Sequence, residues 1–445
     1  MNSPNIIYIL SHDTGRYVQP YGHAIPTPNL QKLAESGALF RQAFCANPTC
    51  SPSRACLLTG QWAHSCDMTG LVNRGWSLPE PQHLITYTLK NAGYTTALAG
   101  FQHVVKNIED GGWEQILSKE ASNKSTEDRA AAFVAGTHDK PFYLDVGFGE
   151  THRRAKGFAP QPDGESKIDA RYVRPPAPFG DNSETRQDMA EYIDAARTLD
   201  QKMSVVFDAV EEHGLGDNTL IICTTDHGIA FPSMKCNLTD HGTGVMLIMK
   251  GPGGFTGGKV VDALVSQVDL YPTICEMIAG VDSPEWLQGT SIVPLMDDSV
   301  DKIRDEIYAE VNYHCCYSPQ RMVRTDRWKY IRRFDDRRTP ELPQCDDSIT
   351  KDHWAEAGWR DQLVSEERLY DLVFDPNETN NLLDNADSQS VLTDMRNRLN
   401  QWLEQTEDPI LKGPMIPHAD AVVNDPDATS PKDDPSFPAR EFLGI

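Results

Sequence analysis

The run NIIYIL at residues 5–10 predicts a buried β-strand, and Ser11, His12 and Asp13 follow it directly. Nearly continuous apolarity, without alternation, is typical of a strand whose sheet is covered on both faces. Four later runs share this character, so we predict five strands of one buried sheet. These runs are TTALAG (95–100), PFYLDVGF (141–148), TLIICTT (219–225) and GVMLIM (244–249).

Helical segments lie between these strands. TPNLQKLAESG (27–37) has Pro28 in its first turn and Gly37 past its end, and a longer segment (188–214) is closed by Gly214. The alternation of strand and helix predicts an α/β domain with a large, mostly parallel central sheet flanked by helices.

The character of the chain changes in its last third. RDEIYAEVNY, QRMVRTDRWKYIRRF and ERLYDLVFD resemble antiparallel strands, and a helix is expected near VLTDMRNRLNQWLEQT. We predict a catalytic α/β domain at 1–303 and a smaller α+β domain with an antiparallel sheet at 304–407. Residues 408–445 are rich in Pro and Asp, which favours an irregular tail that wraps the surface.

Composition narrows the choice of partners and compartment. A formal net charge of -24 argues against nucleic acid or a membrane surface as partner, because phosphate neutralisation needs clustered Lys and Arg. No run approaches the roughly twenty apolar residues of a membrane span. The start MNSPNIIYIL lacks a basic n-region, and the ten cysteines show no repeated CxxC spacing. We therefore expect a cytoplasmic protein with reduced thiols.

Titratable side chains follow four of the predicted strands. Ligands of open α/β sheets bind beyond the carboxyl ends of the strands, so these side chains are expected at one edge. One such residue alone would more often be a helix cap or a turn residue, but four coincident positions indicate a site. The residues are His12 and Asp13, then His103, then Glu150 and His152, and finally Asp226 and His227.

The segment CSPSRACLLTG (50–60) places Cys50 at a predicted helix N-terminus. Pro52 suits the first turn, Ser51 can cap the helix, and Gly60 fits its end. The free N–H groups and the dipole of such a terminus favour an anion, and Arg54 adds a cation one turn later. From these residues alone, Cys50 is a candidate low-pKa thiolate nucleophile.

The pattern C-x-P-S-R followed by A-x-L-L-T-G resembles the signature of the sulfatase family in the alkaline phosphatase superfamily. In that family the cysteine is converted to formylglycine. GYTTALAGFQHV, TTDHGIAFPSMKCNL and LYDLVFDPNETNNL resemble further family blocks in the same order, over most of the chain. The branch that the chain resembles most is the heparan N-sulfatase (sulfamidase) branch, through NLQKLAESGALFRQAF, DHGIAFPS and QWLEQTEDP.

The resemblance implies a sulfuric ester hydrolase or N-sulfohydrolase that acts on a small or saccharide sulfate. It implies formylglycine at Cys50, made by a formylglycine-generating enzyme or an anaerobic maturase, and one divalent metal ion. His103 would assist near the nucleophile, His152 would protonate the leaving group, and Lys235 would grip the sulfate. The implied site is Cys50, Arg54, His103, His152 and Lys235 for catalysis, with Asp13, Asp226, His227, His12 and Cys50 at the metal.

Three positions depart from the family pattern. His12 and His227 stand where the family has Asp and Asn, and they would shift an oxygen-only site for Ca²⁺ towards Mn²⁺, Zn²⁺ or iron. His12 is either a ligand or a residue that orients Asp13. Phe101 stands where a sulfate-binding lysine is expected, and Lys106 is a candidate to replace that cation.

Several alternatives stay open. The same formylglycine site would serve a phosphodiesterase or phosphonate monoester hydrolase, the chain could be a silent anion-binding homologue, or Cys50 could remain a thiol. Three more histidines are candidate pocket residues. His241 would reach the pocket or bond to loop backbone, and His314 and His353 would face the pocket or take a core or surface role.

Overall fold

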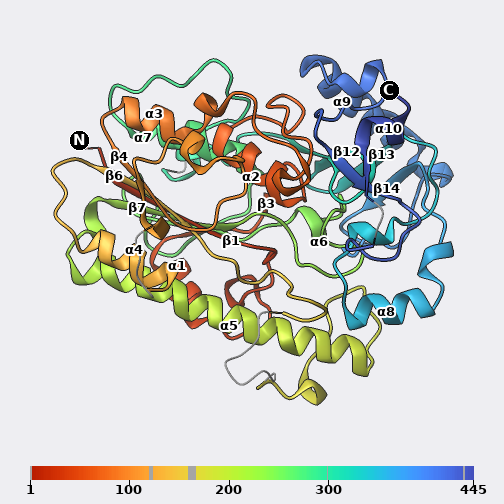
Figure 1. The fold of residues 1–445 in the computed structure, drawn as a ribbon, viewed down its shortest axis with the longest axis horizontal. Helices are drawn as coiled ribbons and strands as arrows, with labels where there is room; N and C mark the ends of the chain where they lie inside the picture. Colours follow the sequence, from red (N-terminus) through yellow and green to blue (C-terminus); the bar gives the residue numbers. More distant parts are fainter. Residues whose placement is uncertain (1–2, 120–123, 159–166, 298, 434–435) are drawn as a thin grey trace.

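The structure is a computed structural model that describes residues 3–119, 124–158, 167–297, 299–433 and 436–445. Its centre is an eight-stranded sheet in the order β5-β4-β6-β1-β7-β8-β2-β9 (Figure 1). The strands are β1 (Asn5–Ser11), β2 (Ala38–Phe40), β4 (Thr95–Gly100), β5 (Gln115–Ile116), β6 (Phe142–Gly147), β7 (Thr219–Thr225), β8 (Leu247–Lys250) and β9 (Lys259–Val261).

The sheet is mixed but mostly parallel, as predicted. β5, β4, β6, β1 and β7 run parallel to one another, whereas β8 is antiparallel to both of its neighbours. The strand predicted at 244–249 begins three residues later, at Leu247. The reason is that the amides of Val245 and Met246 bond to the carbonyls of Ala43 and Gly15 instead of to β7.

Helices cover both faces of the sheet (Figure 1). Ile7 and Ile9 of β1 pack in one buried cluster with leucines of α1 and α5, while Ile6 and Tyr8 share another cluster with leucines of α2 and α3. This split explains the unbroken apolarity of β1. The helices are α1 (Pro28–Ser36), α4 (Thr126–Val134) and α5 (Ser183–Glu212) on the first face, and α2 (Cys50–Thr59), α3 (Ile85–Asn91) and α7 (Leu270–Met277) on the second.

A second sheet forms in the last third of the chain, as predicted. It is antiparallel, in the order β11-β12-β13-β14, and α9 packs on it through Leu399 and Trp402. The tail after residue 407 adds a short hairpin and a short helix to its irregular path. The elements are β11 (Glu306–Tyr313), β12 (Tyr317–Thr325), β13 (Trp328–Arg333), α8 (Ile349–Glu356), β14 (Glu367–Asp371), α9 (Gln389–Gln405), β15 (Val422–Asn424), β16 (Ser436–Pro438) and α10 (Ala439–Leu443).

Smaller elements complete the fold around the site. β3 (Ala43–Phe44) pairs with β10 (Val265–Ser266), and α6 (Asp240–Thr243) follows the loop after β7. All ten cysteines are buried free thiols. Among the helices of the described residues, none combines the length and the apolarity that a bilayer crossing needs.

Candidate active site

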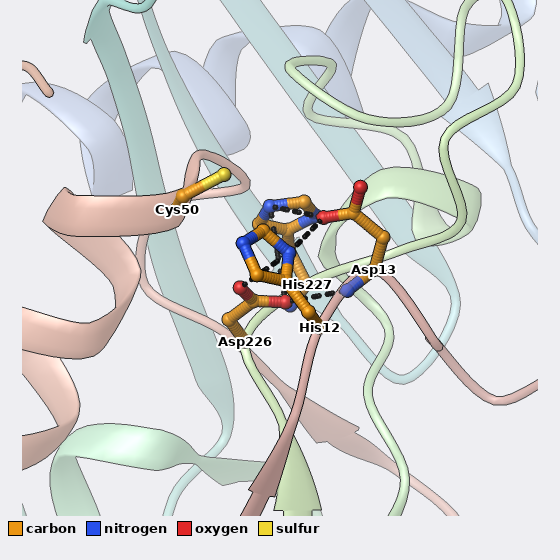
Figure 2. Close-up of side chains that lie close together, drawn as sticks. All are labelled: His12, Asp13, Cys50, Asp226 and His227. Atoms are coloured by element: carbon orange, nitrogen blue, oxygen red, sulfur yellow. Dashed lines mark hydrogen bonds and ion pairs between the residues drawn. The ribbon is translucent and has the colours of Figure 1, made fainter. Parts of the chain in front are cut away.

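Five side chains converge at the carboxyl edge of the central sheet (Figure 2). β1 delivers His12 and Asp13, the adjacent parallel strand β7 delivers Asp226 and His227, and α2 begins with Cys50. Each offers a donor atom to a group whose members all lie within 4.8 Å of one another, and all five are buried. The predicted convergence of four strand ends is thus present in this cluster for two of them, β1 and β7.

The Asp226 carboxylate is anchored by backbone and by a guanidinium. Its Oδ1 accepts bonds from the amides of Asp13 (2.8 Å) and His227 (2.9 Å). Its Oδ2 accepts from Nε (3.2 Å) and a terminal nitrogen (3.0 Å) of Arg54. Burial opposes ionisation, but His227, His12 and Arg54 together hold the pKa of Asp226 below its ordinary value.

His227 has a defined tautomer. Its Nδ1 lies 3.0 Å from the Gly228 carbonyl, which can only accept, so Nδ1 carries the proton. Nε2 is buried, has no hydrogen-bond partner among the described residues, and lies 3.3 Å from Asp13 Oδ1. A cation between this nitrogen and the carboxylate would satisfy both.

His12 also turns a nitrogen to the carboxylates. Nδ1 lies 2.7 Å from Asp13 Oδ1 and 3.3 Å from Asp226 Oδ2. Burial outweighs both carboxylates and lowers the pKa of His12 to about 4, so the ring is neutral at pH 7. The donor set fits one divalent metal ion. It consists of the imidazoles of His12 and His227, the carboxylates of Asp13 and Asp226, and Cys50.

Cys50 is the first residue of α2, which differs from the predicted capping. Thr49 precedes the helix in extended conformation, and Ser51 lies inside it, where its Oγ accepts from the Val72 amide (3.1 Å) instead of capping. Gly60 ends the helix in the left-handed region, as expected. Burial raises the pKa of the Cys50 thiol well above its ordinary value despite Lys235 nearby, so a low-pKa thiolate is not supported.

His152 stands beside the cluster on a more open side. Its Nδ1 donates to the carbonyl of the next residue, Arg153 (2.7 Å). Its Nε2 lies 4.0 Å from Asp13 Oδ2 and is the nitrogen that remains for other contacts. The side chain is 37% exposed, and its ring lies 4.4 Å from that of His12. His152 can therefore meet a bound molecule that reaches the cluster from solvent.

His103 and Phe101 lie together beside the cluster, next to His12 and Arg54. Burial and then Arg54 lower the pKa of His103 to about 3, and its Nδ1 is buried without a hydrogen-bond partner. The Phe101 ring, 38% exposed, lies 5.6 Å from the His12 ring and 5.1 Å from the Arg54 guanidinium carbon. An apolar ring thus occupies the place expected for a cation, and Lys106 is exposed.

Lys235 joins the site to the last third of the chain. Its ammonium donates to Asp13 Oδ2 and to Asp346 Oδ2, both at 2.9 Å. His314, whose Nδ1 is buried and unpartnered, is also close enough for Lys235 and Asp346 to act on its pKa, which burial lowers well below its ordinary value. Sequence reasoning missed Asp346, because no pattern around it marks a loop residue that only tertiary packing brings here.

Three other candidates point elsewhere. Glu150 pairs with Lys202 of α5 at 2.6 Å. His241 bonds through Nδ1 to the Tyr17 hydroxyl (2.8 Å), a side chain and not the backbone that was expected. His353 bonds to the Asn182 side chain at the start of α5 (3.0 Å).

Comparison with known proteins identifies the family of the chain. The family model described as "Sulfatase" matches residues 4–281, and the one described as "N-sulphoglucosamine sulphohydrolase, C-terminal" matches residues 235–353. An ulvan-active sulfatase from Formosa agariphila is 29% identical over 434 residues, which covers 93% of this chain and 82% of the relative. The N-sulphoglucosamine sulphohydrolase of Homo sapiens is 26% identical over 471 residues, which covers 92% of each chain.

A solved structure shows the same fold. The phosphonate monoester hydrolase of Agrobacterium radiobacter superposes with a TM-score of 0.70 at 19% identity, covering 92% of this chain and 97% of that one. The match to the "Sulfatase" family model spans well over half of the 445 residues. It includes all five residues of the buried cluster, His12, Asp13, Cys50, Asp226 and His227. The chain therefore belongs to the sulfatase family.

Proposed function

We propose that the protein hydrolyses a sulfate ester or sulfamate of a saccharide, with a formylglycine nucleophile derived from Cys50. The observation that carries this proposal is the position of Cys50, whose sulfur lies within 4.8 Å of the donor atoms of Asp13, Asp226, His12 and His227. The names of the relatives, an ulvan-active sulfatase and an N-sulphoglucosamine sulphohydrolase, support a sulfated saccharide as substrate.

Asp13, Asp226 and His227 would hold a divalent metal, with His12 as a further donor. The bound ion would supply positive charge that stabilises the negative oxygen of the nucleophile. Two imidazoles in the donor set favour Mn²⁺ or Zn²⁺ over Ca²⁺, which prefers oxygen ligands.

The nucleophile requires oxidation of Cys50 to the aldehyde by a formylglycine-generating enzyme or an anaerobic maturase. Water adds to the aldehyde to form a geminal diol. One hydroxyl loses its proton and attacks sulfur, so an O–S bond forms while the bond to the leaving oxygen or nitrogen breaks. The second hydroxyl then loses its proton, the carbon–oxygen bond to sulfate breaks, and the aldehyde returns with release of sulfate.

Residues around Cys50 supply the charges and protons for these steps. His152 Nε2 would protonate the leaving atom, since its Nδ1 already donates to a carbonyl. Lys235, 2.9 Å from Asp13, would contact the sulfate oxygens, and Arg54 keeps Asp226 ionised and in place. His103, neutral through burial, would assist the proton transfers at the nucleophile.

A second candidate keeps the nucleophile but changes the substrate to a phosphodiester or phosphonate monoester. Two observations favour it: His227 belongs to the cluster, and Phe101 stands where a sulfate-binding cation was expected.

Turnover of an aryl sulfate and an aryl phosphodiester separates the two candidates. Protein with converted Cys50 is stripped of metal and reloaded with Ca²⁺, Mn²⁺ or Zn²⁺, and kcat/KM is measured for both substrates. The proposal predicts a higher kcat/KM for the sulfate, with Mn²⁺ or Zn²⁺ as the better ion. A clear preference for the diester under every metal would replace it with the second candidate.

A further inference from the structure

Asp346 reaches the active site from outside the central sheet. It lies in the loop before α8, and its Oδ2 accepts from the Lys235 ammonium at 2.9 Å. The same ammonium binds Asp13 Oδ2 at 2.9 Å, so one side chain separates Asp346 from the carboxylate that would hold the metal. Asp346 therefore lies beside the cluster of His12, Asp13, Cys50, Asp226 and His227, one side chain away from Asp13.

Solvent exposure differs among the three residues in contact, Asp13, Lys235 and Asp346, and the most exposed one is the one that a ligand can reach. The side chains of Asp13 and Lys235 are 0% and 2% exposed, whereas that of Asp346 is 17% exposed. His152, at 37%, is a second partly exposed polar group beside Asp13. A molecule whose sulfate lies against Lys235 would thus place its next atoms between His152 and Asp346.

The charge of Asp346 decides which atoms suit that place. Burial opposes ionisation of Asp346, but the Lys235 ammonium holds its pKa below its ordinary value, so Asp346 is ionised at neutral pH. A carboxylate accepts hydrogen bonds and cannot donate them, and it repels other anions.

His314 adds an independent sign that a polar ligand belongs here. His314 is 5% exposed, and its Nδ1 has no hydrogen-bond partner in the part of the chain that the structure describes. A buried polar atom beside Lys235 and Asp346 that the protein leaves unsatisfied fits a partner supplied by a bound molecule.

We propose that Asp346 is a specificity residue, which accepts a hydrogen bond from a hydroxyl or amine next to the sulfated position of the leaving group. This rests on the proposed function. The substrate class is a saccharide sulfate with a free vicinal donor, and leaving groups with a carboxylate or second sulfate at that position are rejected.

Two esters that differ in one donor test the proposal. The wild-type enzyme should show kcat/KM about tenfold or more higher for 2-hydroxyphenyl sulfate than for 2-methoxyphenyl sulfate, since a hydrogen bond to a charged group gives discrimination of this size. Asp346→Asn should reduce the ratio to below about threefold.

Asp347→Asn is the matched control, because its neighbouring carboxylate is 18% exposed and bonds to Lys351 (3.1 Å) instead of to the site. It should keep the wild-type ratio. If Asp346→Asn slowed both esters equally, Asp346 would only position Lys235, and the proposal would be overturned. A wild-type ratio near one would also overturn it.

Failure of the proposed function would look different, since neither ester would then release sulfate. Calorimetric titration of Cys50→Ser protein with the same two esters reads the preference without turnover. Tighter binding of the hydroxyl ester that depends on Asp346 supports the specificity role in that case. Equal or absent binding overturns it.

Discussion

A single imidazole shows most clearly why the cluster fits a cation. The Nδ1–H of His227 donates to the Gly228 carbonyl, and its Nε2 lies 3.3 Å from Asp13 Oδ1 without a hydrogen-bond partner among the described residues. His12 differs, because its Nδ1 can donate to Asp13 or bind a metal. We therefore propose His227 as a metal ligand ahead of His12, whose Nδ1 already has a hydrogen-bond partner in Asp13.

His227→Ala should weaken the binding of Mn²⁺ or Zn²⁺ by about tenfold or more, because it removes a lone pair that no other group replaces. Metal content after dialysis against graded chelator, measured by mass spectrometry, gives the affinity. His241→Ala is the control, since His241 bonds to Tyr17 away from the cluster, and it should retain metal as the wild type does. Equal retention by both variants would remove His227 from the ligand set.

The residues found from sequence and those missed differ in one physical respect. His12, Asp13, Asp226 and His227 follow parallel strands that pair side by side, so their convergence follows from the strand pattern. Asp346, which the sequence did not indicate, and His314, for which a pocket role was one of two alternatives, come from segments around the second sheet. Nothing local links those segments to Lys235, and only the packing of the two sheets places them there.

At the scale of elements, β1, β4, β6 and β7 were predictable because each is an apolar run covered on both faces. β3, β5 and β10 have two residues each, which is too short to carry a pattern. The antiparallel direction of β8 was also hidden, because it depends on pairing and not on composition. The same packing brings the loop after β7 against α6.

Gly228 shows how close that approach is. A Cβ there would lie 1.9 Å from the His241 carbonyl oxygen and 2.8 Å from Gly242 Cα, both backbone atoms that cannot rotate away. Gly228→Ala should therefore lower the free energy of unfolding by about 2 kcal/mol or more and weaken metal binding at His227. Denaturant unfolding and metal titration measure the two effects.

Gly180→Ala is the control, since a Cβ there meets nothing within 4 Å. It should change the free energy of unfolding by less than about 1 kcal/mol. Equal stability of the two variants would mean that the β7 loop can move away from α6 at little cost.

Asp145 in β6 makes the stability of the sheet depend on pH. Burial raises its pKa from 3.8 to about 7, although Arg54 opposes this. Between these values the folded protein holds a proton that the unfolded chain has lost, so stability falls as pH rises from about 4 to 7 and then levels off. A shift of this size corresponds to a few kcal/mol, on the order of 1.4 kcal/mol per pKa unit.

Asp145→Asn removes this ionisation. The variant should unfold at a higher temperature than the wild type at pH 8 and at a similar temperature at pH 4.5, as thermal unfolding across that range would show. A variant with the same loss of stability between pH 4.5 and 8 would assign the pH dependence to other groups.

At the scale of the whole molecule, a buried ionic network ties three parts of the chain together. His64, after α2, bonds to Glu310 of β11 (2.7 Å), and Arg321 of β12 binds Asp408 of the tail (2.6 Å). Arg321 also lies 3.5 Å from Glu310, and all these side chains are at most 1% exposed. His64, Glu310 and Asp408 also form a group that could hold a metal ion. Because the Arg321 guanidinium already lies against both carboxylates, we interpret this group as structural and not as a second metal site.

Arg321→Met should lower the free energy of unfolding by about 3–5 kcal/mol, because it leaves Glu310 and Asp408 buried without their cation. Lys302→Met breaks an ion pair with Asp305 that is more than 60% exposed on each side, and it should cost less than about 1 kcal/mol. Denaturant midpoints of the two variants test the contrast. Similar losses would mean that the network does not hold the parts together.

The central claim is that Cys50, once converted to formylglycine, is the nucleophile of a sulfatase. Preparations with different degrees of conversion, each quantified by the mass of the Cys50 peptide, should be assayed with an aryl sulfate under saturating metal. The rate of aryl sulfate hydrolysis should rise in proportion to the converted fraction. It should fall to background when Cys50 remains an alkylatable thiol. Full activity in protein that carries only unmodified Cys50 would contradict it.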